Sequence, residues 1–540
     1  MKKIRTLGIL ILGVSFLFSC TEEIPKRPNI LFIMADDHAY QAISAYDNTL
    51  IETPNIDRIA NDGMLFTNAC VTNSICAPSR AVILTGKHSH LNGKIDNNFP
   101  FDTTQMTFPQ LLQANGYQTA MFGKLHFGNN PKGFDEFKIL PGQGRYYNPE
   151  FITKKEGKKT ITGYVTDLIT DMTINWLKTE REEDKPFFMA YLHKAPHREW
   201  LPAERHYTDF IKRKFKEPET LFDDYSGRGS AAHEAEMNLL KHMNWAGDSK
   251  IYPDVMDQLG IPQTAGWDKG AFAREVGAMN EEQRAAWDAV YGPMNEQFIK
   301  DYPNMSQQDK MKWRYQRYMQ DYLGSIASVD EGVGKVLDYL EESGLAENTI
   351  VIYTSDQGFY LGEHGWFDKR FIYNESFKTP LLVKWPGVIK AGSRNTQMVQ
   401  NLDFAQTILA AAGVEAPADM QGENLIPLFR GETENFRDAV YYHYYEYPAV
   451  HMVKRHYGIV TEDFKLVHFY YDVDEWELYD RKNDPQELRN VYNDPEYVEV
   501  VKRLKADLSD LRIKYKDSEE LDQHFIDKYK EKGLISRGGE

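Results

Sequence analysis

The sequence lacks an excess of positive charge. Among its 540 residues, 80 Asp and Glu outnumber 63 Lys and Arg, which gives a formal net charge of -17 at pH 7. Nucleic-acid binders gain affinity from Lys and Arg that face phosphates, so this balance argues against that class of protein. If the substrate is itself an anion, positive charge must be concentrated in a local site rather than spread over the surface.

The apolar run near the N-terminus is too short to cross a membrane. Residues 7–18 follow three basic residues, and this pattern predicts a secretory signal over residues 1–19. The end of the run, Leu17-Phe18-Ser19-Cys20, resembles a bacterial lipobox, which implies a lipid on Cys20 and a tether over residues 20–27. We therefore expect export and lipid anchoring in the bacterial cell envelope, in the periplasm or on the outer membrane surface. Ordinary cleavage nearby, with an unmodified Cys20, is the alternative.

Cysteine is scarce as well, with three in the whole chain. Once Cys20 is assigned to the lipobox, Cys70 and Cys76 remain. Paired cysteines are the rule in exported proteins, so a disulfide between these two is one interpretation. The residues around Cys76 favour another, in which Cys70 is a buried bystander.

Apolar runs of strand length alternate with amphipathic segments, and we find no internal repeat. This alternation predicts an α/β fold: a large, doubly wound, mostly parallel sheet flanked by helices. Short aromatic segments near the C-terminus predict a smaller antiparallel sheet joined by a helix. The predicted strands of the large sheet are residues 28–35, 117–122, 186–192, 349–355 and 380–385, with a long helix from about 314 to 343. The predicted domains are a main α/β domain over residues 28–425, interrupted by a helical insertion over 201–321, a C-terminal α+β subdomain over 436–515 and a charged tail over 516–540. The insertion either rims the active site or forms a stabilising layer.

Polar residues follow the predicted strands at the ends where ligands bind in parallel sheets. Asp36 and Asp37 follow the first strand, and Asp356 and Gln357 follow a later one. Adjacent carboxylates repel each other unless a cation lies between them, although a solvated turn explains such a pair equally well in isolation. Further polar residues at predicted strand ends are Lys124, His126 and His197.

The stretch around Cys76 carries the most specific signal. Pro78 predicts a helix start, so Cys76 should lie at a helix N-terminus, where free N–H groups favour an anionic group. The spacing Cys76-x-Pro78-x-Arg80, followed by Ala81-Val82-Ile83-Leu84-Thr85-Gly86, resembles the signature of type I sulfatases of the alkaline phosphatase superfamily. In that family the cysteine is oxidised to formylglycine by a maturation enzyme.

The resemblance implies a set of functional residues. One calcium ion, with magnesium as the alternative, is held by Asp36, Asp37, Cys76, Asp356 and Gln357. Gln357 departs from the commoner Asn or His, but its amide oxygen can serve. The catalytic set is Cys76, Arg80, Lys124, His126, His197, His364 and Lys369. Within it, His126 is expected to be the base that releases sulfate, and either His197 or His364 is expected to protonate the leaving oxygen.

The substrate is also inferred from resemblance. The runs from His193 to Trp200 and from Asp356 to Tyr360 are similar to those of bacterial N-acetylglucosamine-6-sulfatases that act on heparan-type glycans. A uronate-2-O-sulfatase and an arylsulfatase are the alternatives, and a noncatalytic glycan-binding lipoprotein is the alternative from another class. The segment from Tyr441 to Glu446, together with His451, either lines the sugar pocket or packs within the small sheet.

Overall fold

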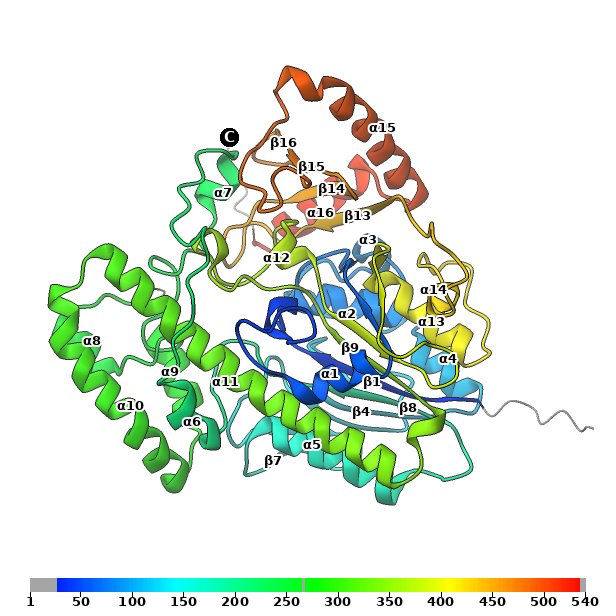
Figure 1. Ribbon diagram of the computed structural model, residues 1–540, viewed down its shortest axis with the longest axis horizontal. Helices are drawn as coiled ribbons and strands as arrows, with labels where there is room; N and C mark the ends of the chain where they lie inside the picture. The colour runs from blue at the N-terminus through cyan, green and yellow to red at the C-terminus, as the bar shows by residue number, and fades with distance from the viewer. Residues whose placement is uncertain (1–26, 265–267, 535–540) are drawn as a thin grey trace, which may run out of the picture.

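The computed structural model describes residues 27–264 and 268–534, and it contains the expected mostly parallel sheet with helices on both faces (Figure 1). The five strands β9, β1, β8, β4 and β5 run parallel at its centre, and β10, β6 and β7 run antiparallel to their neighbours. In spatial order the strands are β11 (Ser393–Asn395), β2 (Met64–Phe66), β10 (Leu381–Lys384), β9 (Thr349–Ser355), β1 (Asn29–Ala35), β8 (Phe187–Leu192), β4 (Gln118–Lys124), β5 (Glu136–Leu140), β6 (Glu150–Thr153) and β7 (Gly157–Thr160).

The central strand β1 is buried on both faces, which explains its continuous apolar sequence. Alternate side chains point to opposite sides. Leu31 and Ile33 pack against α1 (Pro54–Asn61), α5 (Val165–Asn175) and α11 (Gln307–Glu342). Ile30 and Phe32 pack against α2 (Cys76–Thr85), α4 (Phe108–Ala114) and α13 (Phe404–Ala411). Burying each such side chain stabilises the fold by about 1.5–3 kcal/mol, so the carboxyl end of β1 is a rigid platform.

The segment expected to be a helical insertion is indeed helical in its described part. It contains α6 (Glu204–Phe210), α7 (Ser230–Glu234), α8 (Pro253–Leu259), α9 (Asp268–Val276) and α10 (Glu281–Asp301). The long helix α11 begins at Gln307, before the predicted start near Arg314, because Ser306 and Asp309 form a capping box. The last residues assigned to the insertion therefore belong to α11.

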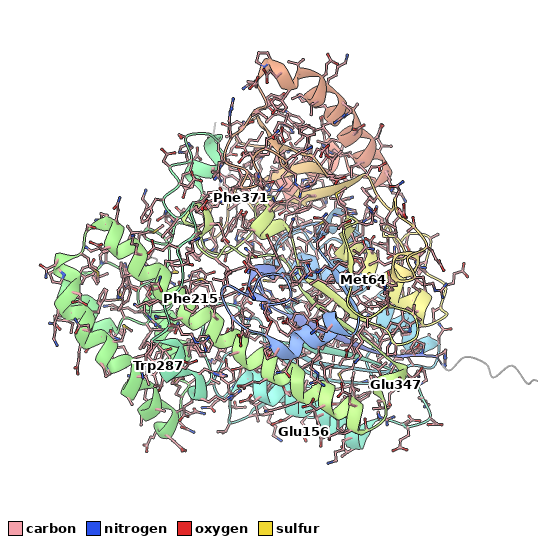
Figure 2. The ribbon with its side chains drawn as sticks, viewed as in Figure 1. Met64, Glu156, Phe215, Trp287, Glu347 and Phe371 are labelled. Carbon is pink, nitrogen blue, oxygen red and sulfur yellow. The ribbon has the colours of Figure 1, made fainter. Side chains whose placement is uncertain are left out.

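The small C-terminal sheet is also present, in the order β13 (Ala439–Tyr444), β14 (His456–Thr461), β15 (Phe464–Phe469) and β16 (Glu475–Asp480). Helix α15 (Val498–Lys514) covers one face through Leu504 and Leu508. The other face packs against Phe371 (Figure 2) and Tyr373. The sheet thus supports the loop between β9 and β10, which carries Lys369.

The stretch predicted to be a charged tail, residues 516–540, contains a helix in its described part. Residues Glu519–Glu531 form helix α16, because every third or fourth residue is apolar. Phe525, Ile526 and Tyr529 are buried against Phe99 and Tyr445.

The two cysteines of the described chain, Cys70 and Cys76, are both buried and unpaired, so the disulfide interpretation is wrong. The signal segment and Cys20 lie outside the described residues. Within residues 27–264 and 268–534, no helix combines the length and apolarity that a membrane crossing requires.

Candidate active site

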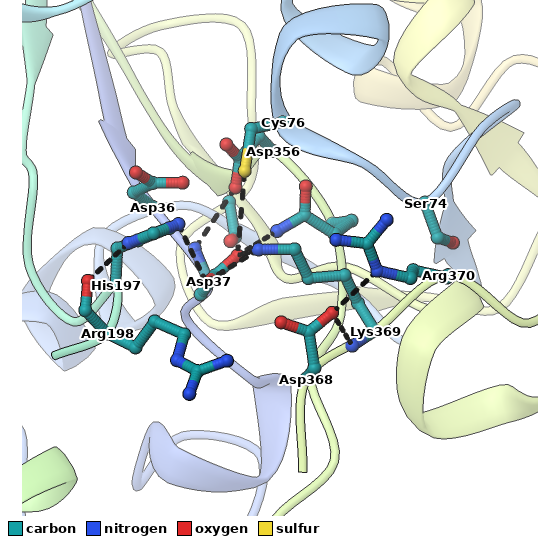
Figure 3. Close-up of polar contacts among 12 residues, drawn as sticks. Asp36, Asp37, Ser74, Cys76, His197, Arg198, Asp356, Asp368, Lys369 and Arg370 are labelled. Atoms are coloured by element: carbon teal, nitrogen blue, oxygen red, sulfur yellow. Dashed lines mark hydrogen bonds and ion pairs between the residues drawn. The ribbon is translucent and has the colours of Figure 1, made fainter. Parts of the chain in front are cut away.

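The site lies where β1 and β9 end side by side. These strands are parallel neighbours, and Ala35 pairs with Ser355 at their last register position. The polar residues that follow each strand are therefore brought together, and the backbone N–H of Asp37 donates to Asp356 Oδ1 at 3.1 Å. One carboxylate oxygen each from Asp36, Asp37 and Asp356 lies within 4.8 Å of the others (Figure 3).

This crowding is electrostatically costly. Burial raises the pKa of Asp37 to about 7 and that of Asp356 to about 6. Burial by itself would also raise the pKa of Asp36, but the charges of Lys124, His197 and Arg80 hold it well below its ordinary value. The protein cations thus neutralise the cluster incompletely, and a bound cation would favour the ionised form of all three carboxylates.

The residues present fit a hard divalent cation. Oδ1 of Asp36 and Oε1 of Gln357 are buried oxygens without a hydrogen-bond partner. The amide nitrogen of Gln357 donates to Asp37 Oδ1 at 2.5 Å, which holds the amide against the three carboxylates. Carboxylate and amide oxygens are the ligands that calcium and magnesium prefer.

Cys76 is the first residue of α2, and its Sγ lies 4.0 Å from Asp37 Oδ1. Arg80 follows one turn later, so both side chains project from the same face of the helix. Cys76 is fully buried, and burial raises the pKa of its thiol well above the ordinary value. Because the thiolate is the nucleophilic form of cysteine, the unmodified residue is poorly suited to attack.

Three buried cations surround the carboxylates. Arg80 Nε donates to Asp356 Oδ2 at 2.9 Å, and Lys124, at the end of β4, pairs with Asp36. Lys369 Nζ donates to both carboxylate oxygens of Asp37, at 2.5 and 2.7 Å. The site therefore gathers three buried cations within a protein of negative net charge. Each is paired with a carboxylate, so a bound divalent cation would add the positive charge that an anionic substrate requires.

The three predicted histidines occupy different places. His197 Nε2 lies 3.8 Å from Asp37 Oδ2, and its Nδ1 lies 2.5 Å from the carbonyl oxygen of Arg198. His126 follows β4 two residues after Lys124, is partly buried, and has a φ of 67° and an Nδ1 without a hydrogen-bond partner. Burial lowers the pKa of His126 and of His197 well below the ordinary value. Both imidazoles therefore favour the neutral form.

His364 lies in a separate cluster. Its Nδ1 is 3.1 Å from Asp223 Oδ2 and 2.5 Å from Arg228, and its Nε2 is 3.7 Å from Glu375. Of the two candidate acids left open by the sequence, His197 lies against Asp37, one of the predicted metal ligands, whereas His364 pairs with Asp223 and Glu375. The residues that the structure does bring together are Asp36, Asp37, Cys76, Arg80, Lys124, His197, Asp356, Gln357 and Lys369.

The residues that flank Lys369 were missed by the sequence analysis. Asp368 and Arg370 are almost fully buried and have positive φ angles of 76° and 97°, which hold the side chains of this turn in place. Arg370 Nε donates to Asp368 Oδ1 at 3.0 Å, and its NH1 donates to Glu446 at 2.8 Å. The sequence does contain a signal for this turn, because three consecutive charged residues, 368–370, stand between two phenylalanines. Glu446 and His451, which lie between β13 and β14, also contact this turn. Glu446 accepts from Arg370, and His451 Nε2 lies 3.3 Å from Asp368 Oδ2.

Comparisons with known proteins match most of the chain. A family model described as Sulfatase matches residues 28–414, and one described as N-sulphoglucosamine sulphohydrolase, C-terminal, matches residues 362–514. An N-acetylglucosamine-6-O-sulfatase of Bacteroides thetaiotaomicron is 47% identical over 521 residues, which cover 95% of this chain and 91% of the relative. The N-acetylglucosamine-6-sulfatase of Homo sapiens is 27% identical over 432 residues, which cover 75% of this chain and 65% of the relative. A solved structure described as a complex with its substrate D-glucosamine-2-N,6-O-disulfate is 47% identical, with a TM-score of 0.86, and the match covers 92% of this chain and 99% of that chain.

Proposed function

Because the chain belongs to the sulfatase family and is therefore a sulfuric ester hydrolase, we propose that it removes the 6-O-sulfate of N-acetylglucosamine in heparan-type glycosaminoglycans. The observation that carries the proposal is the 47% identity, over 95% of the chain, to an N-acetylglucosamine-6-O-sulfatase. A similar structure binds a glucosamine that carries a 6-O-sulfate, which supports the same substrate class.

The polar turn around Lys369 also supports a sugar substrate. Asp368, Arg370 and His451 place a carboxylate, a guanidinium and an imidazole beside the site. Such groups can bind ring hydroxyls and an N-substituent, whereas a simple aryl ring offers them no partner. The arrangement therefore favours a glycan sulfatase over an arylsulfatase.

We propose that Cys76 is the residue converted to formylglycine and that Asp36, Asp37, Asp356 and Gln357 hold a calcium ion beside it. Hydrated formylglycine at Cys76 would supply a nucleophilic hydroxyl and a second hydroxyl that permits release of sulfate, and the cation would supply positive charge. Sulfate esters are expected to react through a loose transition state like that of phosphoryl transfer, so positioning and charge stabilisation dominate catalysis.

The chain's own residues then have distinct tasks. Arg80, Lys124 and Lys369 bind and orient the sulfate oxygens. His197 holds a proton at Nε2 for the leaving sugar oxygen, since the negative charge of a bound sulfate ester favours the protonated imidazole. His126, beside Lys124, accepts the proton when sulfate is released.

The substrate is tested with protein produced together with a formylglycine-generating enzyme. Desalted protein is incubated with defined sulfated monosaccharides, and released sulfate is measured by ion chromatography. We expect release from N-acetylglucosamine-6-sulfate. Cleavage of a 2-sulfated uronate with no action on the 6-sulfated sugar would instead establish a uronate-2-O-sulfatase. A sugar that binds without release of sulfate would favour a noncatalytic glycan-binding protein.

Conversion of Cys76 is tested by mass spectrometry of tryptic peptides. Both cysteines lie in one tryptic peptide, residues 59–80, so fragmentation of that peptide must locate the aldehyde. We expect it at Cys76, whereas the thiol of Cys70, buried and hydrogen-bonded to the carbonyl of Val399 at 3.3 Å, should be unmodified. Finding only thiol at both positions in active protein would remove the proposed nucleophile.

We also propose that the protein is exported and lipid-anchored through Cys20. The lipobox-like sequence supports this anchor. Labelling cells with a fatty-acid analogue should mark the wild-type protein and leave a Cys20→Ala variant unlabelled.

A further inference from the structure

The orientation of His197 depends on the residue that follows it. His197 Nδ1 lies 2.5 Å from the carbonyl oxygen of Arg198, so the Nδ1–H donates to that carbonyl (Figure 3). This hydrogen bond leaves Nε2 as the atom that faces Asp37. The plane of the imidazole is therefore fixed by the backbone of Arg198, and any group that holds Arg198 also holds His197.

The side chain of Arg198 is held by the insertion. Both oxygens of Asp248 bind the guanidinium: Oδ1 lies 3.3 Å from Nε, and Oδ2 accepts from NH2. Such two-point binding restrains the direction of the arginine as well as its position. Asp248 is fully buried, and its Oδ2 also accepts the backbone N–H of Asn244 at 2.8 Å.

Further contacts restrain the same segment. The Arg198 guanidinium lies 5.0 Å from the ring centre of Phe367, and its NH1 is 3.3 Å from His451 Nε2. The next residue, Glu199, pairs with Arg274 of α9. Two consecutive residues after His197 are thus ion-paired with the insertion, which packs against the core through residues such as Trp245 and Val255.

We propose that Asp248 is a positioning residue that holds the imidazole of His197 in its productive orientation through Arg198. The insertion, which the sequence left as either a rim or a stabilising layer, then has a defined part in the reaction. This inference rests on the role proposed above for His197. A misplacement of about 1 Å in a catalytic group can lower the rate about 100-fold, so a buried ion pair remote from the sulfate can matter for catalysis.

The test is a double-mutant cycle on protein produced with its maturation enzyme. The variants are Asp248→Asn, His197→Ala and the double substitution, assayed by sulfate release from N-acetylglucosamine-6-sulfate. Asp248→Asn alone should lower kcat about 10- to 100-fold, with a smaller effect on KM. In the His197→Ala background the same substitution should have no further effect, because the group that it positions is gone.

If Asp248 has a purely structural role, the losses of kcat in the two single variants should multiply in the double variant. That result would overturn this inference but leave the proposed role of His197 intact. Full activity of His197→Ala would overturn the role of His197 and the inference with it. Asp288→Asn on α10 is the matched control, since Asp288 forms an exposed ion pair with Arg284 in the same insertion and should leave kcat unchanged.

A second variant covers the case in which Asp248→Asn does not fold. Arg198→Lys keeps the positive charge and the backbone carbonyl but cannot bind both oxygens of Asp248 in the same geometry. We expect a loss of kcat that again disappears in the His197→Ala background. Unchanged kcat in Arg198→Lys would contradict the proposal.

Discussion

Lys369 and Asp37 form a buried ion pair across the site, with Nζ at 2.5 and 2.7 Å from the two carboxylate oxygens. The two residues are 332 positions apart in the chain. Burial by itself would lower the pKa of Lys369, but Asp37 and the other nearby anionic groups raise it well above the ordinary value. The charged form of Lys369 is therefore favoured at neutral pH, and it presents a cation beside Cys76.

Replacing Lys369 by Ala should lower kcat about 100- to 1000-fold, the usual cost of removing one group that stabilises transition-state charge. The assay is release of sulfate from the sugar substrate. Lys384→Ala is the control, because Lys384, the last residue of β10, pairs with the half-exposed Asp62 and should retain full activity. Equal activity of the two variants would exclude Lys369 from the site.

Removing the cation should lower both activity and thermal stability. A ligand at 100 times its Kd stabilises the folded state by about 2.7 kcal/mol, so a chelator should lower the Tm and added calcium should restore it. In Gln357→Leu, which lacks one proposed ligand oxygen, the calcium-dependent rise in Tm should be reduced.

The matched control is Gln523→Leu on α16, where Gln523 donates to Asp527 far along the chain from the cluster. It should show the wild-type response to calcium. A Tm that does not respond to chelation or to calcium in the wild-type protein would argue against a resident cation.

We expect substitutions of His197 and of His364 to affect different measurements. His197→Ala should lower kcat/KM on the sugar sulfate about 100- to 10,000-fold, as expected for loss of a general acid. His364→Gln should chiefly lower the Tm, because the imidazole of His364 joins Asp223 of the insertion to Glu375. If instead His364→Gln lost activity like His197→Ala at unchanged Tm, His364 would be the acid.

Stability should decline in acid because of buried neutral histidines such as His456. Its Nε2 accepts the N–H of Ile372 at 3.1 Å and its Nδ1 donates to the carbonyl of Lys454 at 2.7 Å, so both nitrogens are committed to the neutral form. Burial lowers the pKa of His456 from 6.5 to about 3. Its contribution to stability is therefore complete above pH 6.5 and is lost as the pH falls from there toward 3, by up to about 1.4 kcal/mol per pH unit.

The His456→Asn variant tests this dependence. We expect it to be less stable than the wild type at pH 7.5, and the difference in free energy of unfolding should shrink as the pH is lowered to 4.5. Denaturant titrations at several pH values measure it. A difference that stays constant with pH would show that His456 does not titrate on unfolding.

Much of the site was predictable because it lies at strand ends. An apolar run followed by polar residues, as at Ala35-Asp36-Asp37 and Ser355-Asp356-Gln357, marks the carboxyl end of a buried strand. Parallel pairing then brings such ends together, whichever loops connect them. Cys76 and Arg80 were predictable because helical spacing alone puts residues four apart on one face.

Residues on irregular segments were not predictable in this way. His364 and Lys369 lie on the same loop, yet one pairs with Asp223 of the insertion and the other with Asp37. No periodicity governs where such side chains point. The tail shows the same limit, since α16 is a stable helix only because Phe99 and Tyr445 provide an apolar surface for it.

The sequence by itself determined the chemistry: the Cys76 motif, the carboxylates at the strand ends and the cations that an anionic ester needs, because these depend on residue type and short-range spacing. The tertiary structure alone decided which histidine lies against Asp37 and near Cys76, and what holds that histidine there. Asp248 reaches Arg198 through packing of the insertion against the core, and contacts between segments so distant in sequence arise only when burial of apolar surface brings them together.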